Sequence, residues 1–462
     1  MKKPLLIISL LAAAQLGAAC SLFKPRTAPY PSGVAFPVIE DGAVTFKGRP
    51  EGGIRARGGS IYLSTRAGIV WCIDAAAKKA TWKFDTDNRL LEPPFPGAEN
   101  IYVRDVDDVL YALSSGGGLL WKRPIGEKIL TPVVEGGGRV LFGTSKGNLW
   151  SIGLDGKDDR VFQAGGAVTG GPVVFGARVV FYSDDRTIHV RELGGRPVWT
   201  YRAPAVVVGP PASDGNSVYF GTEDRWFYCL KIGGTRPKWK VRLGGQIAAE
   251  PVVLGRRLYL PATNSVLYCL NKSGGDIVWW ANVPSRTVYD LALAGDKLIA
   301  ASLSAVLLAL DAATGQKAGA FTAPQDIVAN AAWVDPFLVI AQHDLPTDEG
   351  KLLLLRKEVR VSLSAQKVSP QPTGEEIPLS ATVLGFFEPR YEFYIRSGEK
   401  REVAQKASEK NTWTWFASAE GSYTLGVTVT DARQSREAEI PYTIEKRPEK
   451  KPEEPEKKET PK

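Results

Sequence analysis

The strongest constraint on the fold is a pair of positions that returns every 38 to 40 residues. In each copy a small residue near the end of a predicted strand is followed, nine or ten residues later, by a second position that is usually tryptophan. The small residues are Cys72, Ala112, Ser151, Val190, Cys229, Cys269 and Ala309, and their partners are Trp82, Trp121, Val161, Trp199, Trp239, Trp279 and Gly319. Self-similarity at such a period indicates a solenoid or a propeller.

Each copy also contains short runs of β-branched and aromatic residues separated by glycine, which is typical of strands. Residues 140–142 and 267–270 are two such runs, and Gly274 and Gly275 mark the hairpin that follows the second run. Four short strands in about forty residues make one propeller blade. A tryptophan buries a large area, so its repetition predicts a wedge between neighbouring blades.

The blade count follows from the residues that the seven copies leave over. An eighth unit over residues 327–356 has no fourth strand, and residues 43–46 form an isolated strand near the N-terminus. Pairing that strand with the last unit closes the ring and removes an open sheet edge. We therefore expect an all-β chain with an eight-bladed β-propeller over residues 41–357.

The N-terminus has the pattern of an export signal. Lys2 and Lys3 precede an apolar run, and small residues lead into Cys20. This order predicts a signal peptide over residues 1–19, and a cysteine directly after it resembles a lipoprotein box in which Cys20 carries the lipid. Residues 20–40 are then a lipidated N-terminus with a Pro-rich tether. Plain cleavage without lipidation is the alternative.

Charge and cysteine content exclude some functions. The net charge of +8 is spread over 462 residues without a basic cluster that contains aromatic residues, so no nucleic-acid partner is expected. Apart from Cys20, all cysteines occupy the small position of the repeat. Equivalent positions on packed sheets lie about 10 Å apart, which is too far for a disulfide. Three free, buried thiols are predicted.

The pattern changes after residue 358. Segments such as 359–363, 391–395 and 423–429 alternate between apolar and polar residues, as half-buried strands do. We expect a small β-sandwich over residues 359–445, with Trp413 and Trp415 in its core. Gly421, Ser422 and Tyr423, ahead of a strand that ends at Asp431, resemble immunoglobulin-like bacterial modules, and this resemblance implies an immunoglobulin-like domain with Tyr423 at a corner. Residues 446–462 contain mainly Lys, Glu and Pro, a composition that predicts a disordered tail.

The repeat resembles the tryptophan-docking repeat of quinoprotein propellers, the pyrroloquinoline-quinone (PQQ)-like repeat. Ala309, Asp311, Thr314 and Gly315 match its Ala-x-Asp-x-x-Thr-Gly motif, with Gly319 in place of the tryptophan. Together with the lipoprotein signal, the repeats resemble the propeller lipoproteins of the outer-membrane β-barrel assembly machinery. This resemblance implies a non-catalytic, protein-binding member of the cell envelope. The added C-terminal domain departs from that family's pattern.

Few residues in the sequence suggest catalysis. The two histidines are His189, at a packed repeat position, and His343, in a loop with Asp344, Asp348 and Glu349. Triad chemistry needs a histidine beside a nucleophile, and a metal site needs more than one imidazole among solvated carboxylates. Quinoprotein dehydrogenases carry calcium-binding carboxylates and adjacent cysteines beside the quinone, whereas no two cysteines are adjacent here. We predict no enzyme activity, no cofactor, no metal and no catalytic residue.

A binding surface remains as the candidate site. The turns between second and third strands lie on one rim, and several are charged. The candidate protein-binding residues are Asp184, Asp185, Arg186, Glu223, Asp224, Arg225 and Trp226. The alternative is that Asp favours such turns for conformational reasons.

The sequence supports three functional hypotheses. The first is a lipid-anchored scaffold, facing the periplasm from the outer membrane, that binds envelope proteins during outer-membrane protein assembly. The second is a surface lipoprotein that binds glycan or protein through the immunoglobulin-like domain. The third is a PQQ-dependent dehydrogenase.

Overall fold

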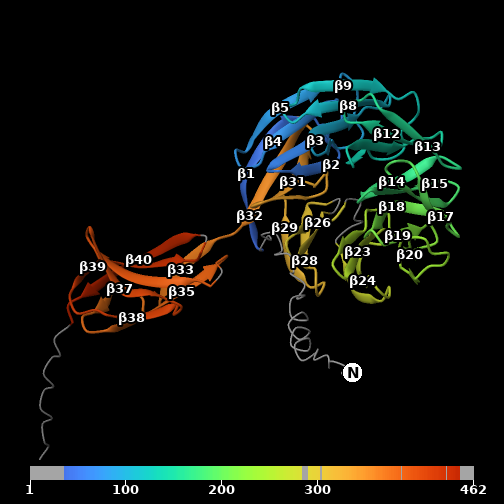
Figure 1. Cartoon of the computed structure of the whole chain (residues 1–462). Helices are drawn as coiled ribbons and strands as arrows, with labels where there is room; N and C mark the ends of the chain where they lie inside the picture. Colours follow the sequence, from blue (N-terminus) through green and yellow to red (C-terminus); the bar gives the residue numbers. More distant parts are fainter. Residues whose placement is uncertain (1–35, 284–289, 302–303, 387, 433, 448–462) are drawn as a thin grey trace, which may run out of the picture. The chain divides into compact units, whose positions relative to one another are not determined.

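The computed structural model describes residues 36–283, 290–301, 304–386, 388–432 and 434–447 (Figure 1). The chain divides into two compact units, Met1–Arg356 and Lys357–Lys462. Cys20 and the predicted signal peptide lie outside the described residues, as does most of the 446–462 tail. Within the described part no helix has the length and apolar character needed to cross a membrane.

The described residues of the first unit form eight four-stranded antiparallel sheets, which we number along the chain. Sheets 1 to 3 are β2 (Pro50–Arg57), β3 (Ser60–Thr65), β4 (Ile69–Asp74), β5 (Lys79–Asp85); β6 (Phe95–Pro96), β7 (Asn100–Arg104), β8 (Val109–Ser114), β9 (Leu119–Pro124); and β10 (Val134–Gly136), β11 (Arg139–Gly143), β12 (Asn148–Gly153), β13 (Asp159–Gln163). Sheets 4 and 5 are β14 (Val168–Phe175), β15 (Arg178–Ser183), β16 (Thr187–Glu192), β17 (Pro197–Arg202); and β18 (Val207–Ser213), β19 (Ser217–Thr222), β20 (Trp226–Lys231), β21 (Trp239–Arg242). Sheets 6 to 8 are β22 (Val252–Leu254), β23 (Arg257–Ala262), β24 (Val266–Asn271), β25 (Ile277–Asn282); β26 (Ala292–Ala294), β27 (Lys297–Ala301), β28 (Val306–Asp311), β29 (Lys317–Thr322); and β30 (Ala332–Val334), β31 (Phe337–Asp344), β32 (Glu349–Lys357), β1 (Val38–Lys47).

The predicted closing strand is confirmed. Strand β1 pairs with β32 and supplies the outer strand of sheet 8. Sheet 8 then packs on sheet 1 through a shared apolar core that includes Phe46, Ile54 and Val339. The Asn330 side chain seals the junction, because its Oδ1 accepts the Ile54 N–H at 2.8 Å and its Nδ2 donates to the Ile54 carbonyl at 3.0 Å.

The strand registers explain the repeat. In sheet 6, Tyr259 pairs with Cys269 and Cys269 pairs with Trp279, so the small residue lies between two aromatic rings whose centroids are 5.9 Å apart. Sheets 1, 2 and 5 contain the same row of three paired residues, a tyrosine, a small residue and a tryptophan. A larger residue at the central position would meet both rings. Cys72, Cys229 and Cys269 are therefore buried and free, as predicted.

Five tryptophans of the repeat each connect their own sheet to the next sheet along the chain. Every indole of the repeat donates its N–H to a backbone carbonyl of the following sheet: Trp82 to Ser115 (2.9 Å), Trp121 to Leu154 (2.8 Å), Trp199 to Gly234 (2.9 Å), Trp239 to Lys272 (3.0 Å) and Trp279 to Ala312 (3.2 Å). The predicted wedge therefore combines apolar packing with a hydrogen bond in one fixed position.

Sheets 3, 4 and 7 depart from this row, and in sheet 4 the only change is Val180 in place of the tyrosine. The prediction that Val161 partners Ser151 was wrong, because Ser151 pairs with Arg160. Side chains alternate along a strand, so Val161 faces the other side and is 45% exposed. Phe162 reaches the next sheet instead, where a Cβ on Gly195 would lie 2.4 Å from its ring.

In sheet 7 the missing tryptophan is replaced from the N-terminus. A Cβ on Gly319 would lie 2.4 Å from Phe36, and Phe36 packs against the apolar core that sheets 7 and 8 share. The segment just before β1 thus occupies space that a tryptophan side chain at position 319 would need.

The second unit consists of two sheets around one core. The three-stranded sheet contains β33 (Arg360–Ala365), β35 (Glu376–Leu384) and β38 (Thr412–Phe416), and the five-stranded sheet contains β34 (Gln371–Pro372), β40 (Ser435–Glu445), β39 (Gly421–Thr430), β36 (Arg390–Ser397) and β37 (Lys400–Ser408). Trp415 is buried in this core and Trp413 packs against it. The Tyr423 hydroxyl donates to the Ala419 carbonyl at 3.1 Å, as in a tyrosine corner. The immunoglobulin-like assignment stays a prediction.

Two glycine substitutions test the tryptophan wedge. Gly315 and Gly255 both have positive φ (72° and 56°), but a Cβ on Gly315 would lie 2.5 Å from the Trp279 ring, whereas a Cβ on Gly255 would have no neighbour within 4 Å. Gly255→Ala should cost about 1 kcal/mol through the backbone alone. Gly315→Ala should cost about 1–3 kcal/mol more, because the ring must move. Urea unfolding measures both, and equal losses would contradict the wedge.

Candidate functional site

Backbone hydrogen bonds hold the turns between second and third strands, both within each turn and to the residue that follows the fourth strand. In sheet 4, Arg186 N–H donates to the Ser183 carbonyl at 3.0 Å, and in sheet 5 Arg225 N–H donates to the Thr222 carbonyl at 3.0 Å. The carbonyls of Arg186 and Arg225 then accept N–H groups from the residues that follow β17 and β21. Both arginines have positive φ (70° and 69°). Since the pattern recurs along the chain, this rim is a rigid surface.

Asp185 serves the turn. Its Oδ1 accepts hydrogen bonds from Ser183 Oγ at 2.6 Å and from the Thr187 N–H at 3.0 Å. Burial alone would raise the pKa of Asp185, but these hydrogen bonds lower it overall. Asp184 is exposed and lies against Gly166, where a Cβ would be 2.0 Å from its Oδ1. The Asp185 side chain therefore stabilises the turn through hydrogen bonds within it.

The next turn is the more accessible one. Glu223, Asp224 and Arg225 are all exposed. Asp224 Oδ1 accepts from Thr222 Oγ1 at 2.6 Å, which stabilises the turn. Trp226 is half-buried, and Lys240 Nζ lies 4.5 Å from the centre of its ring, so one ring face already holds a cation. Glu223 and Arg225 are left as the charged groups that this turn presents to solvent.

One linker joins the two charged turns. Arg186 Nη1 donates to the Pro204 carbonyl at 3.1 Å, and the Val206 carbonyl two residues later accepts the Glu223 N–H at 2.9 Å. The structure thus brings the predicted residues of sheets 4 and 5 onto one continuous surface, with Val206 (40% exposed) between them.

Sequence reasoning missed the apolar part of this rim. Exposed apolar residues lie in the linkers and turns at the same end of the sheets, and they are Leu91, Val106, Leu130, Val206 and Leu345. A backbone hydrogen bond connects the turn of Val106 to the preceding linker, because the Val106 N–H donates to the Arg89 carbonyl at 2.9 Å. A large apolar residue just before the inner strand, as at Leu91 and Leu130, was the available signal. Apolar and charged groups together make a surface suited to a protein partner.

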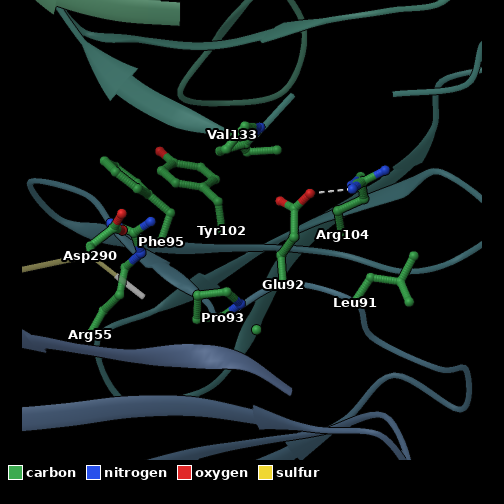
Figure 2. Close-up of a pocket in the computed structure, with 11 residues that line it drawn as sticks. Arg55, Leu91, Glu92, Pro93, Phe95, Tyr102, Arg104, Val133 and Asp290 are labelled. Carbon is green, nitrogen blue, oxygen red and sulfur yellow. Dashed lines mark hydrogen bonds and ion pairs between the residues drawn. The ribbon is translucent and has the colours of Figure 1, made fainter. Parts of the chain in front are cut away.

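The starts of the inner strands enclose a cavity of about 310 Å³ (Figure 2). Figure 2 shows Arg55 and Asp290 beside Phe95 on one side of this cavity, and Glu92 facing Arg104 on the other. Glu92 and Arg104 form an ion pair, and Arg104 Nη1 also donates to Asp108 Oδ1 at 3.1 Å. Burial raises the pKa of Glu92 despite this arginine.

A second cavity of about 490 Å³ shares Arg55, Phe95, Pro132 and Asp290 with the first cavity. It adds the carboxylates Glu135 and Glu250. Burial, together with the charge of Asp290, raises the pKa of Glu250. The lining therefore contains three carboxylates and one arginine, which disfavours an anionic ligand.

His189 is a packed residue, as expected. Its Nε2 lies 3.1 Å from Ser183 Oγ, its Nδ1 is buried without a partner, and its ring stacks on Phe181 at 4.8 Å. Ser183 is 1% exposed, and Asp185 binds the serine rather than the histidine. No substrate reaches this serine, so the contact is not a catalytic triad.

The residues also do not fit a calcium–quinone centre. Across the described ranges no group of three His, Cys, Asp or Glu side chains is placed to hold a metal ion. Cys72, Cys229 and Cys269 lie buried in three different sheets rather than side by side. His343 Nε2 meets only Asp348, at 3.0 Å, among the carboxylates of its loop.

Comparison with known proteins found a matching family model and similar solved structures. The sequence model described as "Outer membrane protein assembly factor BamB" matches residues 40–162, 147–246 and 228–432. The crystal structure of BamB from Moraxella catarrhalis superimposes with a TM-score of 0.57 at 14% identity, over 69% of this chain and 97% of that one. The computationally designed protein Ika8 superimposes with a TM-score of 0.57 at 13% identity, over 67% and 98%. Among curated proteins no sequence matches significantly. The structural likenesses confirm the β-propeller fold.

His189 gives the propeller a predicted pH dependence. Burial, with help from the charge of Arg191, lowers its pKa from 6.5 to about 4. The unfolded chain therefore binds the proton first as pH falls, and stability drops between pH 6.5 and about 4, by at most about 3 kcal/mol. His189→Gln should flatten this part of the pH–stability curve.

Urea unfolding at pH 7 and pH 5 measures the difference between wild type and variant. NMR provides an independent check, because the chain has only two histidines. A His189 imidazole that titrates at its ordinary pKa, or an unchanged slope in the variant, would contradict the buried, neutral state.

Proposed function

The protein belongs to the BamB family of outer-membrane protein assembly factors, and we propose that it is a non-catalytic, protein-binding scaffold in the assembly of outer-membrane β-barrel proteins. The family match over residues 40–432 is the observation that carries this proposal. We propose further that Cys20 is the lipid anchor and that the propeller faces the periplasm.

The rim supports a binding role in physical terms. Its turns are fixed by backbone hydrogen bonds, as at Asp184 N–H to the Ala167 carbonyl (2.8 Å) and Glu223 N–H to the Val206 carbonyl (2.9 Å). A rigid surface loses little entropy when a partner binds. Exposed Glu223 and Arg225 beside Val206 offer both charge selection and apolar contact.

The chemistry of the described residues agrees with a non-enzymatic role. The Ser183–His189 contact is buried, and among the residues that the structure describes the cavities lack a metal-binding set. Glu92, the most enclosed carboxylate of the first cavity, is committed to Arg104. These features favour a scaffold over a PQQ-dependent dehydrogenase.

A charge-neutral double substitution tests the rim. Glu223→Ala with Arg225→Asn removes two of the three exposed charges of this turn and keeps Asp224, which stabilises the turn. Asn tolerates the positive φ of position 225. Affinity purification of the full-length protein from envelope membranes should recover subunits of the β-barrel assembly machinery with wild type. The rim variant should recover at least about tenfold less, as expected for the loss of a binding hot spot.

The matched control is Glu192→Ala with Arg196→Ala. This pair is also charge-neutral, and it lies at the last residue of β16 and in the turn that follows, at the other end of sheet 4. The control should bind like wild type. If wild type recovers no assembly subunit, the proposed function is wrong, and equal losses in both variants would show that the rim is not the site.

Cys20→Ser tests the anchor. The hydroxyl cannot take the thioether-linked lipid, so the variant should move from the membrane fraction to the soluble envelope fraction and lose labelling by a radioactive fatty acid. Immunoblotting of fractionated cells gives the first readout. A variant that stays membrane-bound and labelled would contradict lipidation at Cys20.

A further inference from the structure

A polar pocket of about 450 Å³ lies between sheets 5 and 6, and nothing in the proposed function uses it. It is formed by the turn after β18, the start of β21, the turn after β22 and the turn after β24. Its lining residues are Asp214, Asn216, Ser217, Tyr219, Lys238, Arg256, Asn271, Lys272 and Ser273. The lining thus contains three cations and one carboxylate.

The single carboxylate has a defined structural role. Asp214 Oδ1 accepts the N–H groups of Asn216 at 3.1 Å and Ser217 at 2.8 Å, and Oδ2 accepts the Tyr219 hydroxyl at 3.0 Å. Burial alone would raise the pKa of Asp214, but Lys272 and these hydrogen bonds lower it overall. Asp214 is therefore an anion that holds Lys272 Nζ at 3.0 Å.

The other two cations lack such a partner. Lys238 and Arg256 are exposed, and the ion pairs found among the described residues include neither side chain. Their backbones are nevertheless fixed. Lys238 N–H donates to the Cys229 carbonyl at 2.8 Å, and the Arg256 carbonyl accepts the Lys272 N–H at 2.9 Å. The pocket therefore has a net charge of +2 on a rigid frame.

The corresponding turns within sheet 7 show that this excess is not a general property of the repeat. There Lys297 Nζ contacts Asp296 at 2.7 Å and Asp311 at 3.2 Å, so two carboxylates surround one lysine. In the pocket between sheets 5 and 6, three cations accompany one carboxylate.

We propose that this pocket binds a phosphate monoester, such as a sugar phosphate or the headgroup of phosphatidic acid. A phosphate dianion balances the net charge, and Arg256 offers the planar donor fork that matches phosphate oxygens. Asn271 Oδ1 already accepts the Ser273 N–H at 3.1 Å and the Ser273 hydroxyl at 2.9 Å. The Asn216 amide, Asn271 Nδ2 and the lone pairs of Ser273 Oγ provide donors and acceptors for the hydroxyls of a sugar phosphate.

The first experiment uses glucose 1-phosphate, with glucose as the uncharged comparison. Titration of the full-length protein at low ionic strength, followed by calorimetry or NMR, should show binding of the phosphate and none of glucose. Lys238→Gln with Arg256→Gln should weaken the affinity by about tenfold or more per cation, because each charge-assisted hydrogen bond is worth about 1.4 kcal/mol or more, a factor of ten. Added salt should weaken it further.

The matched control is Lys79→Gln with Lys317→Gln, which removes two exposed charges from β5 and β29. It should retain the wild-type affinity, and its unfolding midpoint and that of the pocket variant should both stay near the wild-type value. An equal loss in the control would mean that net charge attracts the phosphate, which would overturn the site.

The second experiment separates the two sources of phosphate. Vesicles containing phosphatidic acid are compared with phosphatidylcholine vesicles in a flotation assay. Binding to phosphatidic acid that the pocket variant loses and the control keeps identifies a lipid headgroup, whereas binding of glucose 1-phosphate alone identifies a soluble ligand. If wild type binds neither probe up to millimolar concentration, the proposal is wrong. The scaffold role stands apart, because its test depends on the rim.

Discussion

The structure depends on the contact between each repeat tryptophan and the following sheet. A four-stranded sheet cannot bury both of its faces alone, so each sheet needs its neighbour. The indole supplies a large apolar area and also donates one hydrogen bond to a carbonyl of the next sheet, as Trp239 does to Lys272 and Trp279 does to Ala312. The hydrogen bond fixes where the ring lies, and the glycine beneath it, Gly275 or Gly315, fixes how closely the two sheets approach. Where sheet 7 has glycine instead of tryptophan, Phe36 packs against that glycine, so this residue just before β1 is a structural part of the ring.

The tryptophans hold the sheets together, so the outward residues of the turns can vary. The rim turns are stabilised locally, by Asp185 with Ser183 and by Asp224 with Thr222. Their outward residues are therefore not needed for folding, and surfaces of this kind carry function. The same holds for the pocket between sheets 5 and 6, where Asp214 and the Lys272 backbone belong to the frame. Lys238 and Arg256 contribute charge without a structural partner.

The sequence predicted the repeat unit well because one residue row repeats the same contacts. Tyr259, Cys269 and Trp279 are adjacent in space through strand register alone, and that register follows from the spacing. In sheet 3 the prediction for Val161 was wrong because Ser151 pairs with Arg160, one residue earlier in the strand. A register shift of one residue moves a side chain to the other face of the sheet, and the distance between residues in the sequence does not show such a shift. The cavities were not predictable, since Arg55 and Asp290 meet only when the ring closes. Lys238, Arg256 and Lys272 each occupy an ordinary turn, so their common pocket is visible only in three dimensions.

The antiparallel order of the strands separates two kinds of chemistry. Turns between second and third strands lie at one end of each sheet, and turns between first and second or third and fourth strands lie at the other end. The charged and apolar rim around Glu223 and Val206 belongs to the first end, and the cationic pocket of Arg256 and Lys272 belongs to the second. Because the tryptophan wedges hold both ends on one rigid ring, a protein partner at the rim does not compete sterically with an anionic ligand at the pocket. The proposed scaffold therefore has room for a protein at one end of the sheets and for the proposed phosphate-bearing ligand at the other end.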